Sequence, residues 1–208
     1  MTSRNATRRH DDELRELHAQ ERSRGRRRRS VALVAWGAGL LVLAAVVTFG
    51  LVNSQPEQTT TNSLAAPFTL TDTSGAEVSL ADYRGRNVIL YFSEGAGCQS
   101  CLVQMADIER RKADFDAANL VVLPIVMNTV DQITSDMAAN GVTTPFLLDD
   151  GSVSTAYGTI GKGMHGGLPG HSFVVIDAEG IQRWYGEYPS MWLSPDELLA
   201  QANSALSS

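Results

Sequence analysis

The chain has 208 residues and a formal net charge of −6, with 43% apolar and 19% charged residues, so one folded domain with extensions is expected rather than a disordered chain. Residues 1–30 contain ten Arg against five Asp and Glu, whereas residues 31–208 contain seven Lys and Arg against eighteen Asp and Glu. The larger part of the chain would repel phosphate groups, and we therefore expect no nucleic-acid partner. Two cysteines are too few for a disulfide-rich scaffold, an all-cysteine zinc site or an iron–sulfur cluster.

Residues 31–52 predict a transmembrane helix. They contain no charged side chain, and a helix of this length spans about 33 Å, against a hydrocarbon core of about 30 Å. The run RGRRRR at residues 24–29 directly precedes them, whereas residues 53–66 contain no Lys or Arg. The positive-inside rule then predicts a cytoplasmic basic tail at residues 1–30 and an extracytoplasmic domain after the span. The long apolar run and the poor cleavage site favour an uncleaved signal-anchor over a cleaved signal peptide, as in a single-pass bacterial cell-membrane protein.

The remaining chain predicts a linker followed by one domain. Residues 53–66 are polar and Thr-rich and have no periodic apolar face, which is typical of a linker. The domain is expected over residues 67–206, and about 140 residues are enough to bury a core.

Strands and helices are predicted to alternate along this domain. Periodicity and turn residues predict strands at 68–71, 77–80, 87–92, 120–126, 146–148, 172–177 and 181–185. They predict helices at 101–118, 130–140 and 195–206. Gly141 is placed to end the second helix, and Ser194 with Pro195 to begin the third. Pro124 is expected to weaken the ladder of its strand. This order, with its closing hairpin, predicts a mixed α/β sheet covered by helices on both faces.

Cys98 and Cys101 form a CxxC motif between the apolar run NVILYF and an amphipathic helix. Such a turn can close a disulfide with little backbone movement. The first cysteine lies at a helix N-terminus, where the positive end of the dipole stabilises thiolate, the attacking species in disulfide exchange. We therefore expect redox chemistry here. A structural disulfide or half of a zinc site is the alternative, although a short loop constrains the unfolded chain little and zinc needs further ligands.

Three segments resemble the redoxin branch of the thioredoxin fold, which includes membrane-anchored thiol–disulfide oxidoreductases of the TlpA and ResA type and AhpC/TSA-type peroxiredoxins. The segments are residues 66–101, TPFLLDDGSVSTAYGT and PGHSFVVIDAEG, and the resemblance covers roughly residues 65–205. It implies a thioredoxin-like fold with Cys98 as the nucleophile and Cys101 as the resolving thiol. With the predicted topology, it implies a thiol–disulfide oxidoreductase outside the cytoplasmic membrane that needs no cofactor beyond its redox-active disulfide. Extracytoplasmic protein thiols or disulfides and a membrane electron donor or acceptor are the expected partners.

The chain departs from this family pattern at several positions. Gly97 stands where thioredoxin-like oxidoreductases commonly carry Trp before the first cysteine. Peroxiredoxins carry Pro and Thr at the positions of Tyr91 and Gly95, so the peroxide-activating hydroxyl is missing and thiol peroxidase is a further alternative. The family also places a cis-proline opposite the CxxC, and this role is assigned to Pro169.

Two ionisable residues near the motif add hypotheses. Glu94, four residues before Cys98, can accept a proton from a cysteine or raise its pKa, unless it is a solvated loop carboxylate. His171 allows a second function, a copper-binding metallochaperone similar to Sco proteins with Cys98, Cys101 and His171 as ligands. Sco cysteines are spaced CxxxC, however, and His171 can instead tune the pKa of the motif.

Overall fold

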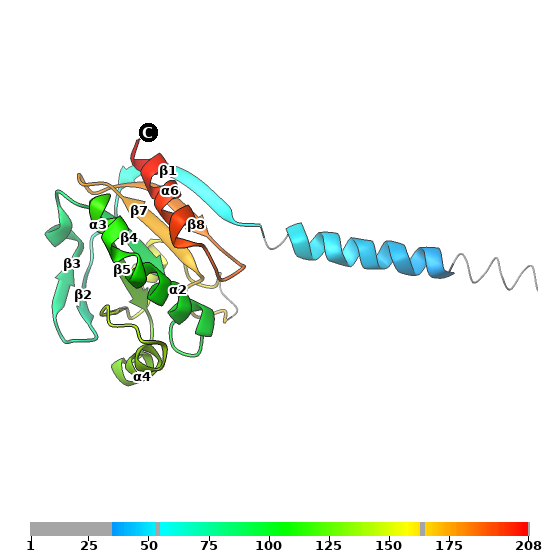
Figure 1. The fold of residues 1–208 in the computed structure, drawn as a ribbon, viewed down its shortest axis with the longest axis horizontal. Helices are drawn as coiled ribbons and strands as arrows, with labels where there is room; N and C mark the ends of the chain where they lie inside the picture. The colour runs from blue at the N-terminus through cyan, green and yellow to red at the C-terminus, as the bar shows by residue number, and fades with distance from the viewer. Residues whose placement is uncertain (1–34, 53–54, 163–164, 208) are drawn as a thin grey trace, which may run out of the picture. The chain divides into compact units, whose positions relative to one another are not determined.

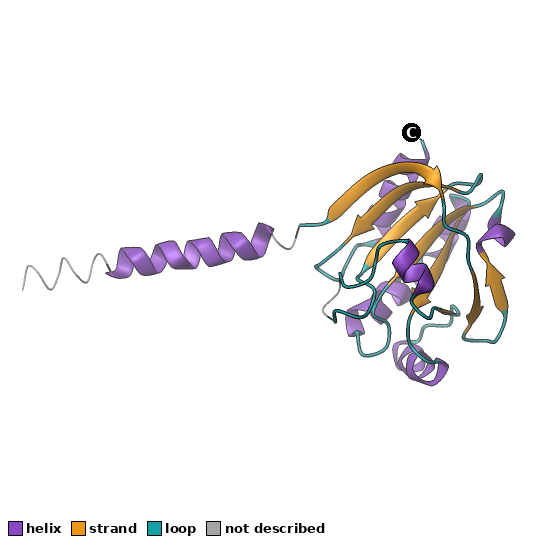
Figure 2. Cartoon of the chain, turned by 180° about the vertical axis from the view of Figure 1, so that it is seen from behind, coloured by secondary structure: helices purple, strands orange, loops and turns teal. Residues whose placement is uncertain are grey.

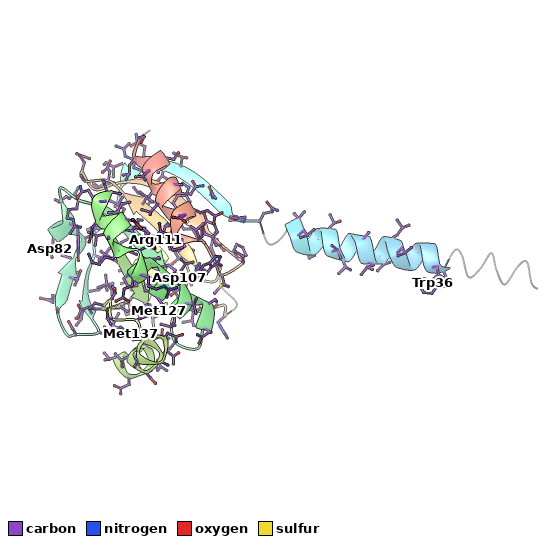
Figure 3. The ribbon with its side chains drawn as sticks, in the orientation of Figure 1. Trp36, Asp82, Asp107, Arg111, Met127 and Met137 are labelled. Atoms are coloured by element: carbon purple, nitrogen blue, oxygen red, sulfur yellow. A yellow bond between two sulfur atoms is a disulfide. The ribbon has the colours of Figure 1, made fainter. Side chains whose placement is uncertain are left out.

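The computed structural model describes residues 35–52, 55–162 and 165–207, and the chain divides into two compact units, Met1–Asn53 and Ser54–Ser208. The described part of the first unit is one helix, Ala35–Val52, with a mean hydropathy of 2.2. Its side chains are exposed, and Figure 3 shows Trp36 projecting from it. This helix is long and apolar enough to cross a membrane. The predicted basic tail lies outside the described residues.

The second unit is built on one mixed sheet of eight strands in the order β1-β8-β7-β4-β5-β6-β2-β3 (Figures 1 and 2). The strands are β1 Glu57–Leu64, β2 Thr69–Asp72, β3 Glu77–Ser79, β4 Asn87–Phe92, β5 Leu120–Val126, β6 Leu147–Leu148, β7 Ser172–Ile176 and β8 Ile181–Glu187. Strand β4 runs parallel to β5 and antiparallel to β7. The strand that precedes the CxxC is therefore in the middle of the sheet.

Helices lie on both faces of this sheet. They are α2 Gln99–Arg110, α3 Lys112–Ala117, α4 Val130–Asn140, α5 Ser152–Ala156 and α6 Pro195–Leu206, with a 3-10 turn at Leu80–Tyr83. Because side chains alternate along a strand, β4 contributes to two apolar cores. Ile89 and Tyr91 join the core that contains the buried residues of α2, α4 and α6. Leu90 and Phe92 join the core of the other face, beside α5. The predicted mixed sheet with two covered faces is confirmed.

Local capping signals place the helix ends where the sequence predicts them. The hydroxyl of Ser194 accepts a hydrogen bond from the N–H of Glu197, and Pro195 occupies the first turn of α6. Helix α4 ends at Gly141, whose φ of 68° is the left-handed conformation that glycine adopts without strain.

The predicted linker is wrong for residues 57–64, which form the edge strand β1. This strand pairs antiparallel with β8, from Glu57 opposite Glu187 to Leu64 opposite Ile181. Seven of its eight residues are exposed. The segment shows no apolar alternation because backbone pairing with β8, rather than side-chain burial, makes it a strand. Its run of β-branched Thr residues suits this conformation.

The predicted helix at 101–118 is also corrected. Helix α2 begins two residues earlier, and the helical run breaks at Arg111, whose φ of −101° and ψ of 16° are not helical. The Arg111 side chain, labelled in Figure 3, pairs with Asp114 of α3 and Asp196 of α6. Strand β5 runs through Pro124, because β6 pairs only with Ile125 and Val126 and leaves Pro124 one strand neighbour, β4.

Candidate active site

The loop between β4 and α2 is held by two side chains that accept hydrogen bonds from its backbone N–H groups. Asn128 Oδ1 accepts the N–H of Ala96 at 2.8 Å, and Asp136 Oδ2 accepts the N–H of Gly97 at 2.8 Å. The loop that follows β4 and the loop that follows its parallel neighbour β5 therefore meet here. A Cβ at Gly95 would overlap Asn128 Oδ1 and Val126 Cγ1. A side chain therefore has no room at Gly95 in this backbone, and this is a physical reason for the absent hydroxyl.

Cys98 and Cys101 are joined by a disulfide at the N-terminus of α2. Cys98 is the N-cap residue, and Cys101 lies in the first turn. Cys98 is 7% exposed, whereas Cys101 is fully buried. Of the two cysteines, Cys98 is therefore the one with surface open to an incoming reagent. Ser100 supplies a hydroxyl whose Oγ lies 3.4 Å from Cys98 Sγ.

Behind the disulfide, His171 contacts the buried cysteine. Its Nδ1 lies 3.9 Å from Cys101 Sγ and 3.2 Å from the hydroxyl oxygen of Tyr91. Its Nε2 lies 3.4 Å from Oε1 of Gln104. Burial lowers the pKa of His171 to about 3 and raises the pKa of Tyr91 above its ordinary value. At neutral pH this cluster is uncharged.

Sequence reasoning missed Tyr91 and Gln104 as members of this site. The sequence presents Tyr91 as part of the apolar run NVILYF and as the position of a family proline, and it presents Gln104 as a polar residue between Leu102 and Met105. Gln104 is nevertheless fully buried. A polar side chain inside the apolar face of a helix is the signal that could have identified it.

Glu94 is buried, and its described hydrogen bonds are to His165. Its carboxylate accepts the N–H of His165 at 3.0 Å, and its other oxygen lies 2.8 Å from His165 Nδ1. Only 2% of the Glu94 surface is exposed. Glu94 is therefore not a solvated loop carboxylate, which was the alternative to a role beside the cysteines. Its described contacts tie the loop after Ile160 to the end of β4.

The cis-proline assignment to Pro169 is wrong, because no cis peptide bond occurs in the described parts of the chain. Pro169 forms an isolated bridge with Ile160, and the N–H of Gly170 donates to Thr159. These contacts precede β7, and His171, two residues after Pro169, lies 3.9 Å from the sulfur of Cys101.

The structure does not support copper binding by Cys98, Cys101 and His171. Both sulfurs are bonded to each other, and the residues that the structure describes contain no group of three His, Cys, Asp or Glu side chains able to hold a metal ion. We derive no step through copper.

Comparison with known proteins links this site to a family. The sequence profile of the AhpC/TSA family matches residues 61–185. A Mycobacterium tuberculosis protein named "putative peroxiredoxin" is 42% identical over 104 residues, which are 49% of this chain and 66% of that protein. Peroxiredoxin Q of Sedum lineare chloroplasts is 30% identical over 132 residues, 62% of this chain and 69% of that protein.

Solved structures share the fold. The M. tuberculosis peroxidoxin BcpB superposes with a TM-score of 0.58 at 20% identity, over 71% of this chain and 96% of that one. Enterococcus faecalis AhpC superposes with a TM-score of 0.61 at 17% identity, over 69% of this chain and 90% of that one. The second unit therefore has the thioredoxin-like fold of these proteins.

Proposed function

Because the chain belongs to the AhpC/TSA family, we propose that it is a thiol peroxidase in which Cys98 reduces hydroperoxides and Cys101 resolves the product. The observation that carries this proposal is the disulfide between a partly accessible Cys98 and a buried Cys101 at the N-terminus of α2. The names of the curated relatives, which are peroxiredoxins, support peroxide as the oxidant.

The two thiols account for the electrons of the reaction. The Cys98 thiolate attacks one oxygen of the hydroperoxide, the O–O bond breaks, and the alkoxide or hydroxide leaves and takes up a proton. Cys98 is then a sulfenic acid. The Cys101 thiol condenses with it, a disulfide forms and water leaves. An external dithiol returns both cysteines to the reduced state.

Two features favour the Cys98 thiolate. The first turn of α2 presents the positive end of the helix dipole to Cys98. The Ser100 hydroxyl, 3.4 Å from Cys98 Sγ, can donate a hydrogen bond to the thiolate. We propose that this hydroxyl compensates for the missing side chain at Gly95.

The direct test is peroxide consumption by the reduced full chain in detergent. We expect the wild type to consume hydrogen peroxide catalytically with a dithiol reductant. Cys98→Ser should abolish the reaction. Cys101→Ser should complete one turnover and accumulate sulfenic acid, which dimedone traps. A wild-type rate no higher than that of Cys98→Ser would exclude peroxidase activity.

The second candidate is a thiol–disulfide oxidoreductase, favoured by Gly95 and by the CxxC spacing. Here Cys98 attacks a substrate disulfide and Cys101 releases the reduced product, without any oxygen chemistry. The same preparation discriminates the two, because insulin reduction without peroxide consumption would favour this candidate. Its substrates would then be protein disulfides or thiols, with a membrane electron donor or acceptor.

For location, we propose an anchor with a cytoplasmic N-terminus and an extracytoplasmic domain. The apolar helix Ala35–Val52 and the Arg run before it support this orientation.

A further inference from the structure

We propose that His171 is the general base of the resolving step, and that its Nδ1 takes the thiol proton of Cys101 as this cysteine attacks. The inference rests on the proposed two-cysteine cycle, whichever substrate oxidises Cys98. It concerns the second half of the cycle, in which Cys101 is the nucleophile.

The burial of Cys101 creates the need for such a base. Cys101 has no exposed surface, and His171 is 1% exposed. Solvent therefore reaches the Cys101 proton only when the core opens locally. The Nδ1 atom of His171, 3.9 Å from Cys101 Sγ, lies within hydrogen-bond reach of the sulfur. A thiol attacks only as the thiolate, so the proton needs an acceptor within the core.

Gln104 determines which imidazole nitrogen is free. The backbone N–H of Leu193 donates to Gln104 Oε1 at 2.9 Å, and a backbone N–H can only donate. This atom of Gln104 is thus its oxygen, an acceptor. His171 Nε2, 3.4 Å from the same oxygen, must then carry the hydrogen and donate. In the neutral ring Nδ1 is consequently the bare acceptor, and it faces Cys101.

Tyr91 leaves this acceptor available in the reduced state. Its hydroxyl lies 3.1 Å from the carbonyl oxygen of Cys101 and 3.2 Å from His171 Nδ1. Burial raises the pKa of Tyr91, so the hydroxyl stays protonated and can donate to either atom. In the disulfide form it donates to this carbonyl oxygen, which leaves Nδ1 without its hydrogen. When Cys101 carries a proton, the S–H can donate to Nδ1 while Tyr91 donates to the carbonyl.

The surroundings of His171 favour a transient rather than a lasting positive charge. The hydrogen-bonding and aromatic partners of the ring that the structure describes are Tyr91 from β4, Cys101 and Gln104 from α2, and Phe173 from β7. None of them carries a charge at neutral pH in the disulfide form. An imidazolium would be stabilised there only beside the Cys101 thiolate.

The step balances in atoms and electrons. The Cys101 proton moves to His171 Nδ1, the Cys101 sulfur bonds to Cys98 Sγ, and the bond from Cys98 to its leaving group breaks. From a sulfenic acid the leaving group is hydroxide, which takes a proton from solvent and becomes water. From a mixed disulfide it is a thiolate. His171 then loses its proton to solvent when the core opens. In this step the Cys101 sulfur is oxidised, and the sulfenic Cys98 sulfur or the departing thiol is reduced by the same amount. Over the whole cycle the two cysteines lose two electrons to the hydroperoxide or the substrate disulfide.

Ellman's reagent tests this step without peroxide. Added to the reduced full chain in detergent, it first reacts with Cys98 and releases one thionitrobenzoate, and Cys101 then displaces the second. We expect His171→Gln to leave the first phase unchanged and to slow the second about 100-fold or more, the lower range for general-base catalysis. His165→Gln, which alters the other described histidine, is the control and should leave both phases unchanged.

The pH profile separates catalysis from packing. With a neutral base in place, the second phase should be independent of pH near neutrality. In His171→Gln it should rise about tenfold per pH unit, because hydroxide must then remove the proton. His171→Asn serves if His171→Gln does not fold, which the first phase and near-ultraviolet circular dichroism report.

Two outcomes keep the proposals distinct. A second phase in both His171 variants with the rate and pH profile of the wild type would overturn the base assignment. Peroxide that goes unconsumed while the two wild-type phases persist would remove the peroxidase proposal and leave the assignment of His171 intact.

Discussion

Gly95 and Gly97 both have positive φ angles in the loop before Cys98, at 71° and 86°. Their surroundings differ. A Cβ at Gly95 would meet Asn128 and Val126, whereas at Gly97 it would meet nothing within 4 Å. A substitution at Gly97 therefore measures the conformational cost of a Cβ at positive φ, and one at Gly95 measures that cost together with a steric clash.

We expect Gly97→Ala to lower the free energy of unfolding by about 1–2 kcal/mol, the usual cost of a left-handed residue with a Cβ. Gly95→Ala should cost about 1–3 kcal/mol more, because its Cβ also overpacks the loop. Urea unfolding of the full chain in one detergent measures both. Equal losses would contradict the steric account of Gly95.

Ser100 permits a test of the hydroxyl beside the attacking sulfur. Ser100→Ala removes a hydrogen bond to a charged group, and we expect the reaction of Cys98 with peroxide or Ellman's reagent to slow about tenfold. Ser100→Thr keeps a hydroxyl at this position and is the control. The measurement is the first-phase rate constant of Ser100→Ala. A value equal to that of the wild type would show that the Ser100 hydroxyl does not assist Cys98.

At the scale of elements, β1 shows how a polar segment becomes part of a sheet. It lies at the edge, pairs with β8 alone, and has seven exposed residues among its eight. The antiparallel ladder with β8 is therefore expected to supply most of its contribution to stability.

Neighbouring residues of an edge strand point their N–H groups alternately to the partner and to solvent. We expect one of Thr59→Pro and Thr60→Pro to lose a ladder hydrogen bond and destabilise the domain, and the other to be tolerated. Hydrogen exchange of β8 amides in the two variants measures the effect. Equal protection in both would show that β1 does not support β8.

At the scale of the whole molecule, the buried His171 links stability to pH. Burial lowers its folded-state pKa from the ordinary 6.5 to about 3. Between these values the unfolded chain binds the extra proton, so folding stability is full above about pH 6.5 and is lost as the pH falls. The loss approaches about 1.4 kcal/mol per pH unit.

Denaturant unfolding at several pH values between about 4.5 and 7.5 measures this slope. His171→Gln should flatten it. Asp72 and Asp177, whose pKa values hydrogen bonds lower, act in the same direction but only below about pH 4, near the ordinary carboxyl pKa. A slope in His171→Gln as steep as in wild type would assign the acid sensitivity to other groups.

The N-terminal helix makes a prediction for the entire chain. Expressed in a bacterium, the protein should sediment with membranes and resist extraction with alkaline carbonate, and removal of residues 1–53 should release the domain. Protease added to spheroplasts should digest the domain if it is extracytoplasmic. A domain protected until lysis would reverse the proposed orientation.

Short-range patterns were sufficient for much of the fold and for the centre of the site. The apolar run NVILYF, the CxxC and the following amphipathic helix are contiguous, so sequence reasoning located β4, the cysteine pair and α2 together. Ser194 and Gly141 act within one helix turn, and the ends of α6 and α4 followed from them. Strand β1 was missed because its partner lies more than a hundred residues away in the chain.

The sequence by itself determined the features whose causes lie within a few residues: the apolar N-terminal helix, the strand–CxxC–helix junction and the capped helices. Only the tertiary structure decided which distant groups meet the cysteines. Pairing of β4 with β7 brings His171 to Cys101, the burial of α2 turns Gln104 toward the same ring, and the loop after β5 closes the space above Gly95. The physical reason is that sheet register and core packing depend on contacts between residues far apart in the sequence, and local periodicity and turn residues do not specify those contacts.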